Sequence, residues 1–140
     1  MGASDRRRFL CLAGSGAALL AGHALSAAEL HAFFVAEAER MKRLAVDAGD
    51  QPYGAVVVRD GAIVGFGPSR VIAERNPDAH AERVALRDAQ ARLGTADLAG
   101  AVLYSTSRPC PACEAAAAAA NLDRMLVGPD AADAGKPRPR

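Results

Sequence analysis

Residues 76–116 read "NPDAHAERVALRDAQARLGTADLAGAVLYSTSRPCPACEAA" and contain three predicted elements in succession. Apolar residues recur at helical spacing over residues 79–93, and a glycine follows them. A β-rich run at residues 101–106 comes next, followed by a turn and an alanine-rich helix over residues 110–120. Strands that alternate with helices predict an α/β layer structure with some parallel strand pairing.

The flanking sequence extends this pattern on both sides. Upstream, residues 54–67 hold two β-rich runs around Asp60 and Gly61, which is a strong hairpin signal. Before the hairpin, residues 27–49 have the apolar spacing of a helix that ends at a glycine. Downstream, residues 123–128 predict a last strand. The chain of 140 residues has no internal repeat and fits one domain with a single sizeable core.

Two short motifs within this stretch suggest a metal site. Cys110 and Cys113 lie three residues apart at the start of a predicted helix, so both sulfurs face the same way, and the helix N-terminus favours their thiolate forms. His80 and Glu82 also fall at a helix start, where side chains lean towards the N-terminus and can reach a group beyond that end. One imidazole and two thiolates form a zinc set that leaves a fourth position for water, which predicts His80, Cys110 and Cys113 as ligands.

Glu82 is predicted to act beside the metal and not as a ligand. Zinc lowers the pKa of water towards neutrality, and a carboxylate at this place can take the water's proton and pass it to a ring nitrogen and then to the leaving amine. This chemistry suits attack at a C–NH2 carbon of a heterocycle, with loss of ammonia. The order His-x-Glu, then Pro-Cys-x-x-Cys, is the signature of zinc deaminases.

With "PYGAVVVRDGAIVGFG" before them and "LDRMLVG" after them, these motifs resemble the cytidine-deaminase-like superfamily, in its branch of guanine deaminases and tRNA adenosine deaminases. The resemblance covers most of residues 52–128 and implies a three-layer α/β/α sandwich around a mixed β-sheet. It also implies zinc at His80, Cys110 and Cys113, proton transfer by Glu82, and a backbone N–H of Ala81 that binds a polar edge of the base. The implied reaction is hydrolytic deamination of a small nucleobase or nucleoside, with a purine such as guanine favoured.

Three features depart from the pattern of that branch. Ser69 stands where members usually carry an asparagine that binds the base, so Ser69 is the predicted base contact here. Arg108 stands where a glutamate usually precedes the Pro-Cys pair, which places a cation near the rim of the predicted site. The family normally continues beyond residues 126–128 with another strand and helix, so we expect the C-terminal part of the fold to be truncated in a chain that ends at Arg140.

Residues 1–27 have the order of an export signal. Arg6–Arg8 precede an apolar run that is too short for a mature membrane anchor, and small residues around Ser26 offer a cleavage site. The arginine pair with the following Phe-Leu resembles a twin-arginine signal, which predicts a periplasmic protein. The alternative is an amphipathic helix that stays attached. Residues 28–128 then form the zinc deaminase domain, and residues 129–140 are predicted to be a disordered tail.

Charge argues against nucleic acid as a partner. Without residues 1–26 the chain has 14 basic and 15 acidic residues, which gives no electrostatic footprint for a polyanion. The expected partner is a small-molecule base or nucleoside, with no membrane contact after signal removal. A homodimer is a further expectation from the resemblance.

Two other functions fit the same thiols. A Cys-x-x-Cys pair at the head of a helix in an exported protein is typical of thiol–disulfide exchange. The upstream His-x-Glu motif, the preceding hairpin and the late position of the cysteines favour zinc over this alternative. A zinc-binding but inactive relic of a deaminase is the other alternative, suggested by Ser69 and by the short C-terminus.

Overall fold

The computed structural model of the chain describes residues 22–140, so residues 1–21 of the predicted export signal, twin-arginine motif included, lie outside the described part. Three helices and five strands follow one another in this order: α1 (Ala27–Asp47), β1 (Gly54–Arg59), β2 (Ala62–Pro68), α2 (Ala81–Leu93), β3 (Val102–Ser105), α3 (Pro111–Ala119), β4 (Arg124–Val127) and β5 (Ala132–Gly135).

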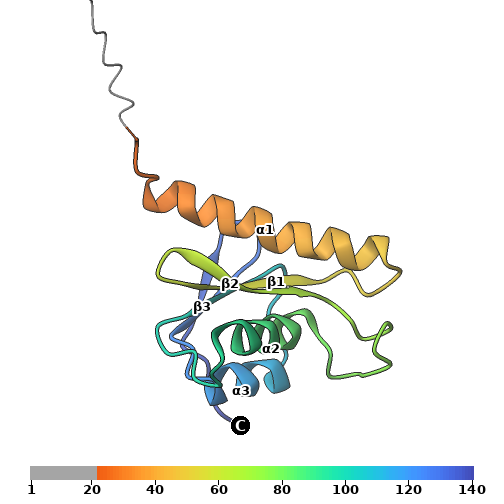
Figure 1. Cartoon of the computed structure of the whole chain (residues 1–140). Coiled ribbons are helices and arrows are strands. Elements are labelled where there is room, and N and C mark those ends of the chain that lie inside the picture. Colours follow the sequence, from red (N-terminus) through yellow and green to blue (C-terminus); the bar gives the residue numbers. More distant parts are fainter. Residues whose placement is uncertain (1–21) are drawn as a thin grey trace, which may run out of the picture.

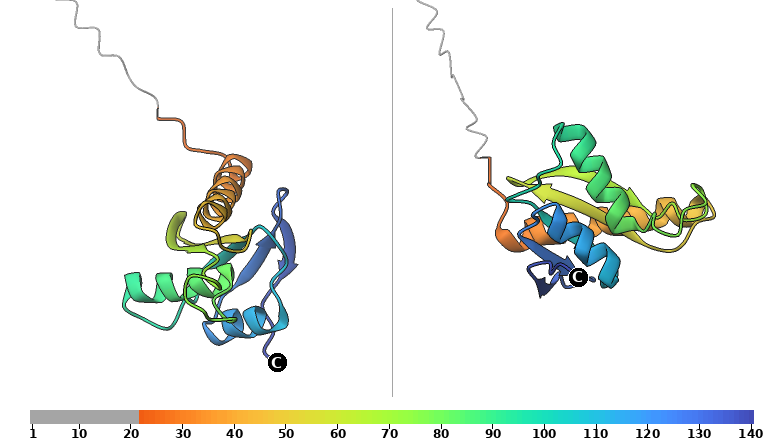
Figure 2. Two further views of the ribbon diagram at one scale, coloured as in Figure 1. Left: turned by 90° about the vertical axis from the view of Figure 1, so that its right-hand side faces the viewer. Right: turned by 90° about the horizontal axis from the view of Figure 1, so that it is seen from below.

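The five strands form one mixed sheet in the order β2-β1-β3-β4-β5. β1 pairs antiparallel with both β2 and β3, β3 pairs parallel with β4, and β4 pairs antiparallel with β5. α1 covers one face of the sheet, and α2 and α3 cover the other (Figure 1). The predicted three-layer α/β/α sandwich is therefore confirmed. α2 and α3 lie next to each other on their face (Figure 2).

Local signals account for the ends of these elements. Ser26 and Glu29 form a reciprocal capping box at the start of α1. Gly94 ends α2 in the left-handed conformation, with a φ of 66°. Asp60 and Gly61 both have positive φ, as a two-residue turn between β1 and β2 requires. The hairpin and the three helices thus lie where their sequence patterns predict them.

α1 is amphipathic and lies on the sheet through Phe34, Ala38, Met41 and Ala45, which are all buried. The opposite side of α1 is polar or exposed, so this helix of 21 residues is apolar on one side only. Within residues 22–140, no helix combines the length and the apolarity needed to cross a bilayer.

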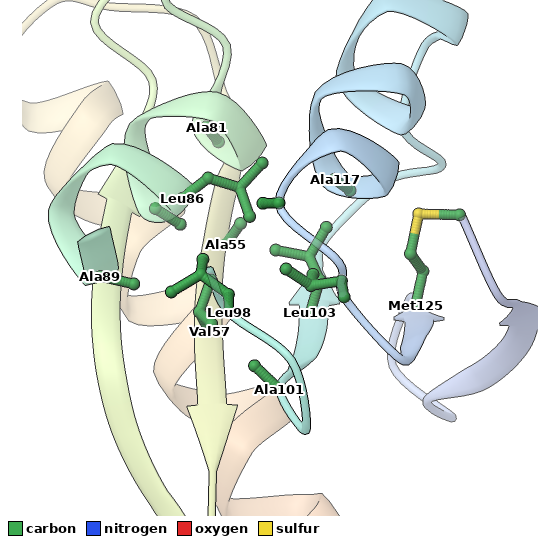
Figure 3. Packing of buried hydrophobic residues seen from close by; sticks show 13 residues of the cluster. Ala55, Val57, Ala81, Leu86, Ala89, Leu98, Ala101, Leu103, Ala117 and Met125 are labelled. Atoms are coloured by element: carbon green, nitrogen blue, oxygen red, sulfur yellow. The ribbon is translucent and has the colours of Figure 1, made fainter. Parts of the chain in front are cut away.

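Each face of the sheet has its own core, and the two cores differ in composition. The core under α1 contains Phe34, Ala38, Met41, Val56, Val58, Tyr104 and Leu126. The core under α2 and α3 contains Ala55, Val57, Ala81, Ala85, Leu86, Ala89, Leu98, Ala101, Leu103, Ala117, Ala120, Leu122 and Met125 (Figure 3). Seven of these thirteen residues are alanine, so the second core brings its helices near the sheet with little side-chain volume between them.

Two glycines of β2 let α2 approach the sheet closely. A Cβ at Gly67 would lie 2.1 Å from the Ala81 carbonyl oxygen and 2.5 Å from the Ala85 nitrogen, and a Cβ at Gly65 would lie 2.3 Å from the Ala85 oxygen. Because these neighbours are backbone atoms, no side-chain rotation relieves the overlap. The glycines therefore fix the position of the N-terminal half of α2, where His80 and Glu82 are found.

The prediction of a disordered tail over residues 129–140 is wrong, because these residues form a strand and then contact α3. β5 pairs with β4, with Val127 opposite Ala132 and Leu126 opposite Asp133. Further on, Pro137 is buried, and Arg138 donates from both its backbone N–H and its Nε to Glu114 of α3. The strand arises because β4 offers unpaired backbone groups at the sheet edge, and the tail then returns along α3.

Candidate metal centre

Three potential metal ligands converge where α2 and α3 begin. His80 Nδ1 lies 3.4 Å from Cys113 Sγ and 3.6 Å from Cys110 Sγ. All three donor atoms lie within 4.8 Å of one another, and Cys113 is buried while the other two residues are half-buried. The structure thus brings together the three residues that the sequence predicts as ligands, although 30 residues separate His80 from Cys110.

The spacing of these donors fits tetrahedral zinc. With Zn–N near 2.0 Å and Zn–S near 2.3 Å, the edge between a nitrogen and a sulfur ligand of a tetrahedron measures about 3.5 Å. The two observed N···S distances of 3.4 and 3.6 Å match this edge. Two sulfurs and an imidazole are also donors that suit zinc better than they suit calcium or magnesium. The donor set therefore fits Zn²⁺ in both geometry and chemistry.

Two of the three candidate ligands, His80 and Cys110, occupy helix N-caps, and neither residue type is among those usually preferred there. His80 is the N-cap of α2 but makes no side-chain capping hydrogen bond, because its ring faces the two sulfurs. Cys110 is the N-cap of α3, where its sulfur accepts a hydrogen bond from the Cys113 N–H at 3.4 Å. Pro111 at the first helical position fixes the backbone here.

The buried sulfur needs a cation to ionise. Burial raises the pKa of the Cys113 thiol, and the negative charge of Glu82 raises this pKa further. Without a metal the Cys113 thiol is therefore protonated at neutral pH. A divalent cation reverses this preference because a coordinated sulfur binds as thiolate, so metal binding at this place must release a proton.

Glu82 lies beside the three donors as a buried carboxylate. Its side chain is only 4% exposed, and one oxygen, Oε1, accepts a hydrogen bond from the Ser105 hydroxyl at 3.1 Å. Ser105 ends β3, so the sheet itself holds this carboxylate in place. A buried carboxylate costs stability, and one placed in a cavity beside a candidate metal site has the position of a proton carrier.

A cavity of about 550 Å³ opens directly over this group. Its lining consists of Gln51, Pro52, Tyr53, His80, Glu82, Ser107, Arg108 and Cys110. The volume is within the range of small-molecule sites. Tyr53 is 43% exposed, so its ring is available at the wall. The loop before β1 thus forms one wall, a contribution that the sequence motifs did not indicate.

Ser69 is not among the residues that line this cavity, although its backbone N–H donates to the carbonyl of Tyr53 at 3.1 Å. Its side chain is buried, and its hydroxyl donates to Asp50 at 3.0 Å. The carboxylate of Asp50 also accepts from the backbone N–H groups of Gln51, Ile72 and Ala73, and these bonds keep its pKa low despite the opposing effect of burial. Ser69 therefore joins the loop before β1 to the loop after β2, and this geometry gives no support to a direct contact with a base.

Ala81 is the first residue of α2 and is fully buried. A first helical residue has an N–H with no acceptor inside its own helix, so this group is free of the helix ladder. That the Ala81 N–H binds a substrate stays a prediction.

Comparison with known proteins gives a consistent picture. Residues 28–129 match the family described as the cytidine and deoxycytidylate deaminase zinc-binding region. Guanine deaminase of Bacillus subtilis is 40% identical over 84 residues, which are 59% of this chain and 54% of that protein. A tRNA-specific adenosine deaminase of Aquifex aeolicus is 33% identical over 94 residues, which are 67% of this chain and 62% of that protein. The chain thus spans little more than half the length of these two relatives.

A solved structure of the Bacillus subtilis guanine deaminase superimposes with a TM-score of 0.67 at 36% sequence identity. The superposition covers 70% of this chain and 63% of the other. The similarity therefore includes the arrangement of the sheet and helices as well as the sequence motifs.

Proposed function

This chain belongs to the family of cytidine and deoxycytidylate deaminase zinc-binding domains, and on that premise we propose that it is a zinc-dependent hydrolytic deaminase of a small nucleobase or nucleoside. The reaction replaces an exocyclic amine of the ring by oxygen from water and releases ammonia. Guanine or another purine is the proposed substrate, since the guanine deaminase of Bacillus subtilis is among the similar proteins in both sequence and structure.

One observation carries this proposal. A buried carboxylate, an imidazole and the sulfur of Cys110 border a single cavity large enough for a heterocycle, and the buried sulfur of Cys113 lies directly behind them, 3.4 Å from the imidazole. A thiol–disulfide protein has no need of the histidine at 3.4 and 3.6 Å from its two sulfurs. It has no need of the buried Glu82 either. The full set is what hydrolysis of a C–NH2 group requires.

Each residue has a distinct role in this proposal. His80, Cys110 and Cys113 hold the zinc, which when bound supplies a positive centre that makes water acidic near neutral pH. Glu82 accepts one proton from the attacking water and delivers it to a ring nitrogen, and it then carries the second proton, from the new C–OH group, to the amine, which departs as ammonia. The Ser105 hydroxyl keeps the Glu82 carboxylate oriented. Tyr53 and Pro52 offer an apolar surface for the ring at the cavity wall.

The proposal is tested by metal analysis followed by an ammonia-release assay across guanine, adenine, cytosine and their nucleosides. We expect about one zinc per chain and release of ammonia that is lost in Glu82→Gln with the zinc retained. A His80→Ala variant should lose the zinc. A protein loaded with zinc but inert towards every aminated base and nucleoside would contradict the catalytic part. Reversible cycling of the two cysteines that is unchanged in His80→Ala would instead support thiol–disulfide exchange.

Location and assembly complete the proposal. We propose export to the periplasm through the twin-arginine pathway, as the order of charge, apolar run and small residues in residues 1–27 suggests. Folding with zinc before export would protect the paired thiols from oxidation. The proposed partner is a small molecule and not a nucleic acid, and the proposed assembly is a homodimer.

A further inference from the structure

Arg108 occupies a place on the cavity rim that the deamination chemistry does not use. It lines the same cavity as His80, Glu82 and Cys110 and is itself exposed. Pro109 and the start of α3 follow it directly, so its backbone is fixed close to the metal ligands. A guanidinium is cationic at every physiological pH, which makes Arg108 a permanent positive charge at the mouth of the site.

No partner within residues 22–140 neutralises this charge by contact. Among these residues Arg108 makes no hydrogen bond and no ion pair, and its one recorded interaction is a weak electrostatic effect on Glu114. Glu114 is already bound by Arg138, whose Nε lies 3.1 Å from its carboxylate in a segment anchored by the buried Pro137. Arg138, and not Arg108, therefore forms the ion pair with this carboxylate.

The other acid of the cavity does not compensate Arg108 either. Glu82 is buried at the back of the site and bonded to Ser105. The remaining lining residues, Gln51, Pro52, Tyr53 and Ser107, are uncharged. The N–H donors of the Arg108 guanidinium are therefore available to a ligand that enters this cavity. Ser107 and Gln51 offer further polar groups in the lining.

From this arrangement we propose that Arg108 is a specificity-determining residue that selects substrates with an oxyanion, a phosphate or a carboxylate, attached to the aminated ring. The planar guanidinium can donate two parallel hydrogen bonds to either group, and such charge-assisted pairs are among the strongest that proteins make. The cavity of about 550 Å³ leaves room for a ring with a substituent. This inference rests on the proposed deaminase function and narrows its substrate class.

The first test measures binding without turnover. The full zinc-loaded chain carrying Glu82→Gln is titrated calorimetrically with matched pairs that differ only in the anionic group: guanosine against guanosine 5′-monophosphate, and pterin against pterin-6-carboxylate. We expect the anionic member of at least one pair to bind about tenfold tighter or more, since hydrogen bonds to a charged group are of that size. The pair that shows the effect distinguishes phosphate from carboxylate as the recognised group.

Substitutions at Arg108 then assign the preference. Arg108→Gln should remove the advantage of the anionic ligand, Arg108→Glu should reverse it, and Arg108→Lys should keep part of it because charge remains while the fork geometry is lost. Arg43→Gln, at an exposed arginine of α1 that does not line the cavity, is the matched control and should keep the full advantage. The preference of the unsubstituted chain should weaken as salt is added.

Turnover gives a second readout and separates this inference from the proposed function. In the active chain the ratio of kcat/KM for the anionic and neutral members should fall in Arg108→Gln mainly through KM. Deamination with equal preference for both members, or a preference that survives in Arg108→Gln, would overturn the role of Arg108 and leave the deaminase function standing. Tighter binding of a tRNA anticodon stem-loop than of every small anion would also overturn it. If no ligand is deaminated, the proposed function fails, while the binding experiment still decides whether Arg108 recognises anions.

Discussion

The cores on the two faces of the sheet differ in their residues and in what they contribute to the molecule. Under α1 the core uses large side chains, among them Phe34, Met41 and Tyr104, and six of the seven residues in this cluster are larger than alanine. Under α2 and α3 alanine predominates, and Gly65 and Gly67 let a helix backbone nearly touch the sheet. The proposed zinc ligands and Glu82 all come from this second face.

The difference shows how a site can be positioned. Large apolar side chains supply most of the burial energy, at about 25 cal/mol per Å² of apolar surface. Small residues supply less energy but set the distance between backbones, which decides where a helix starts. The face with α1 therefore mainly stabilises the fold, whereas the face with α2 and α3, which also buries Leu98, Leu103 and Leu122, both stabilises the fold and positions two helix N-termini. Substitutions can separate these two contributions.

The largest effect is expected for Glu82→Gln on the second face. Loss of the proton carrier should lower the deamination rate by about 10²- to 10⁴-fold, as is usual for general acid–base groups. Stability should not fall, because the change removes a buried charge and keeps a side chain of similar size. Steady-state ammonia release and thermal melting measure the two quantities. Glu39→Gln on α1 is the matched control. An equal loss of deamination rate in that variant would contradict the assignment of the catalytic role to the face with α2 and α3.

Phe34→Ala should have the largest effect on stability alone. Removal of a buried phenyl ring is expected to lower the free energy of unfolding by about 3–5 kcal/mol, measured by urea denaturation. The neighbouring Phe33→Ala, at a side chain that is 51% exposed, should change it by less than about 0.5 kcal/mol. Folded Phe34→Ala protein should still bind zinc, and a loss of zinc under native conditions would mean that both faces position the site.

Gly67→Ala should lower the free energy of unfolding less than Phe34→Ala does, but it should weaken zinc binding. Because the new methyl group meets the backbone of α2, we expect a loss of about 1–3 kcal/mol together with weaker zinc binding, as the start of α2 is displaced. Gly54→Ala is the counterpart on the other face, since a Cβ there would lie 2.2 Å from the Ala38 oxygen of α1. It should cost a similar amount and leave zinc affinity unchanged. Competition with a chelator measures both affinities.

The smallest effect is expected for Tyr104→Phe. Tyr104 is buried, and its hydroxyl lies 2.6 Å from His31 Nδ1 on α1. Loss of this hydrogen bond should lower the free energy of unfolding by about 1 kcal/mol, and a double-mutant cycle with His31→Ala should show coupling of the pair. Deamination should be unaffected, since this pair joins α1 to the sheet on the face away from the site.

Much of this arrangement could be predicted from the sequence because its signals are local. The turn at Asp60 and Gly61, the glycine after α2 and the apolar spacing of α1 each determine one boundary through nearby residues. The imidazole of His80 and the sulfurs of Cys110 and Cys113 could be predicted as one group, because the sequence places each of them at the start of a helix.

Features that depend on distant partners could not be predicted in this way. The prolines and basic residues of the tail indicated a disordered end, and β5 itself has no β-branched or aromatic residue, so only pairing with the edge of β4 makes it a strand. Ser69 resembles a substrate contact by position, but its hydroxyl goes to Asp50, 19 residues away. The spacing of Gly65 and Gly67 within one strand was an available signal for close helix packing.

The most direct test of the account is X-ray absorption at the zinc edge, on the full chain and on His80→Ala, with zinc per chain measured in parallel. The account predicts about one zinc with one nitrogen and two sulfur neighbours from the protein, and loss of that zinc in the variant. Zinc bound with no sulfur neighbours, or bound equally well without His80, would contradict the claim that the starts of α2 and α3 together form the site.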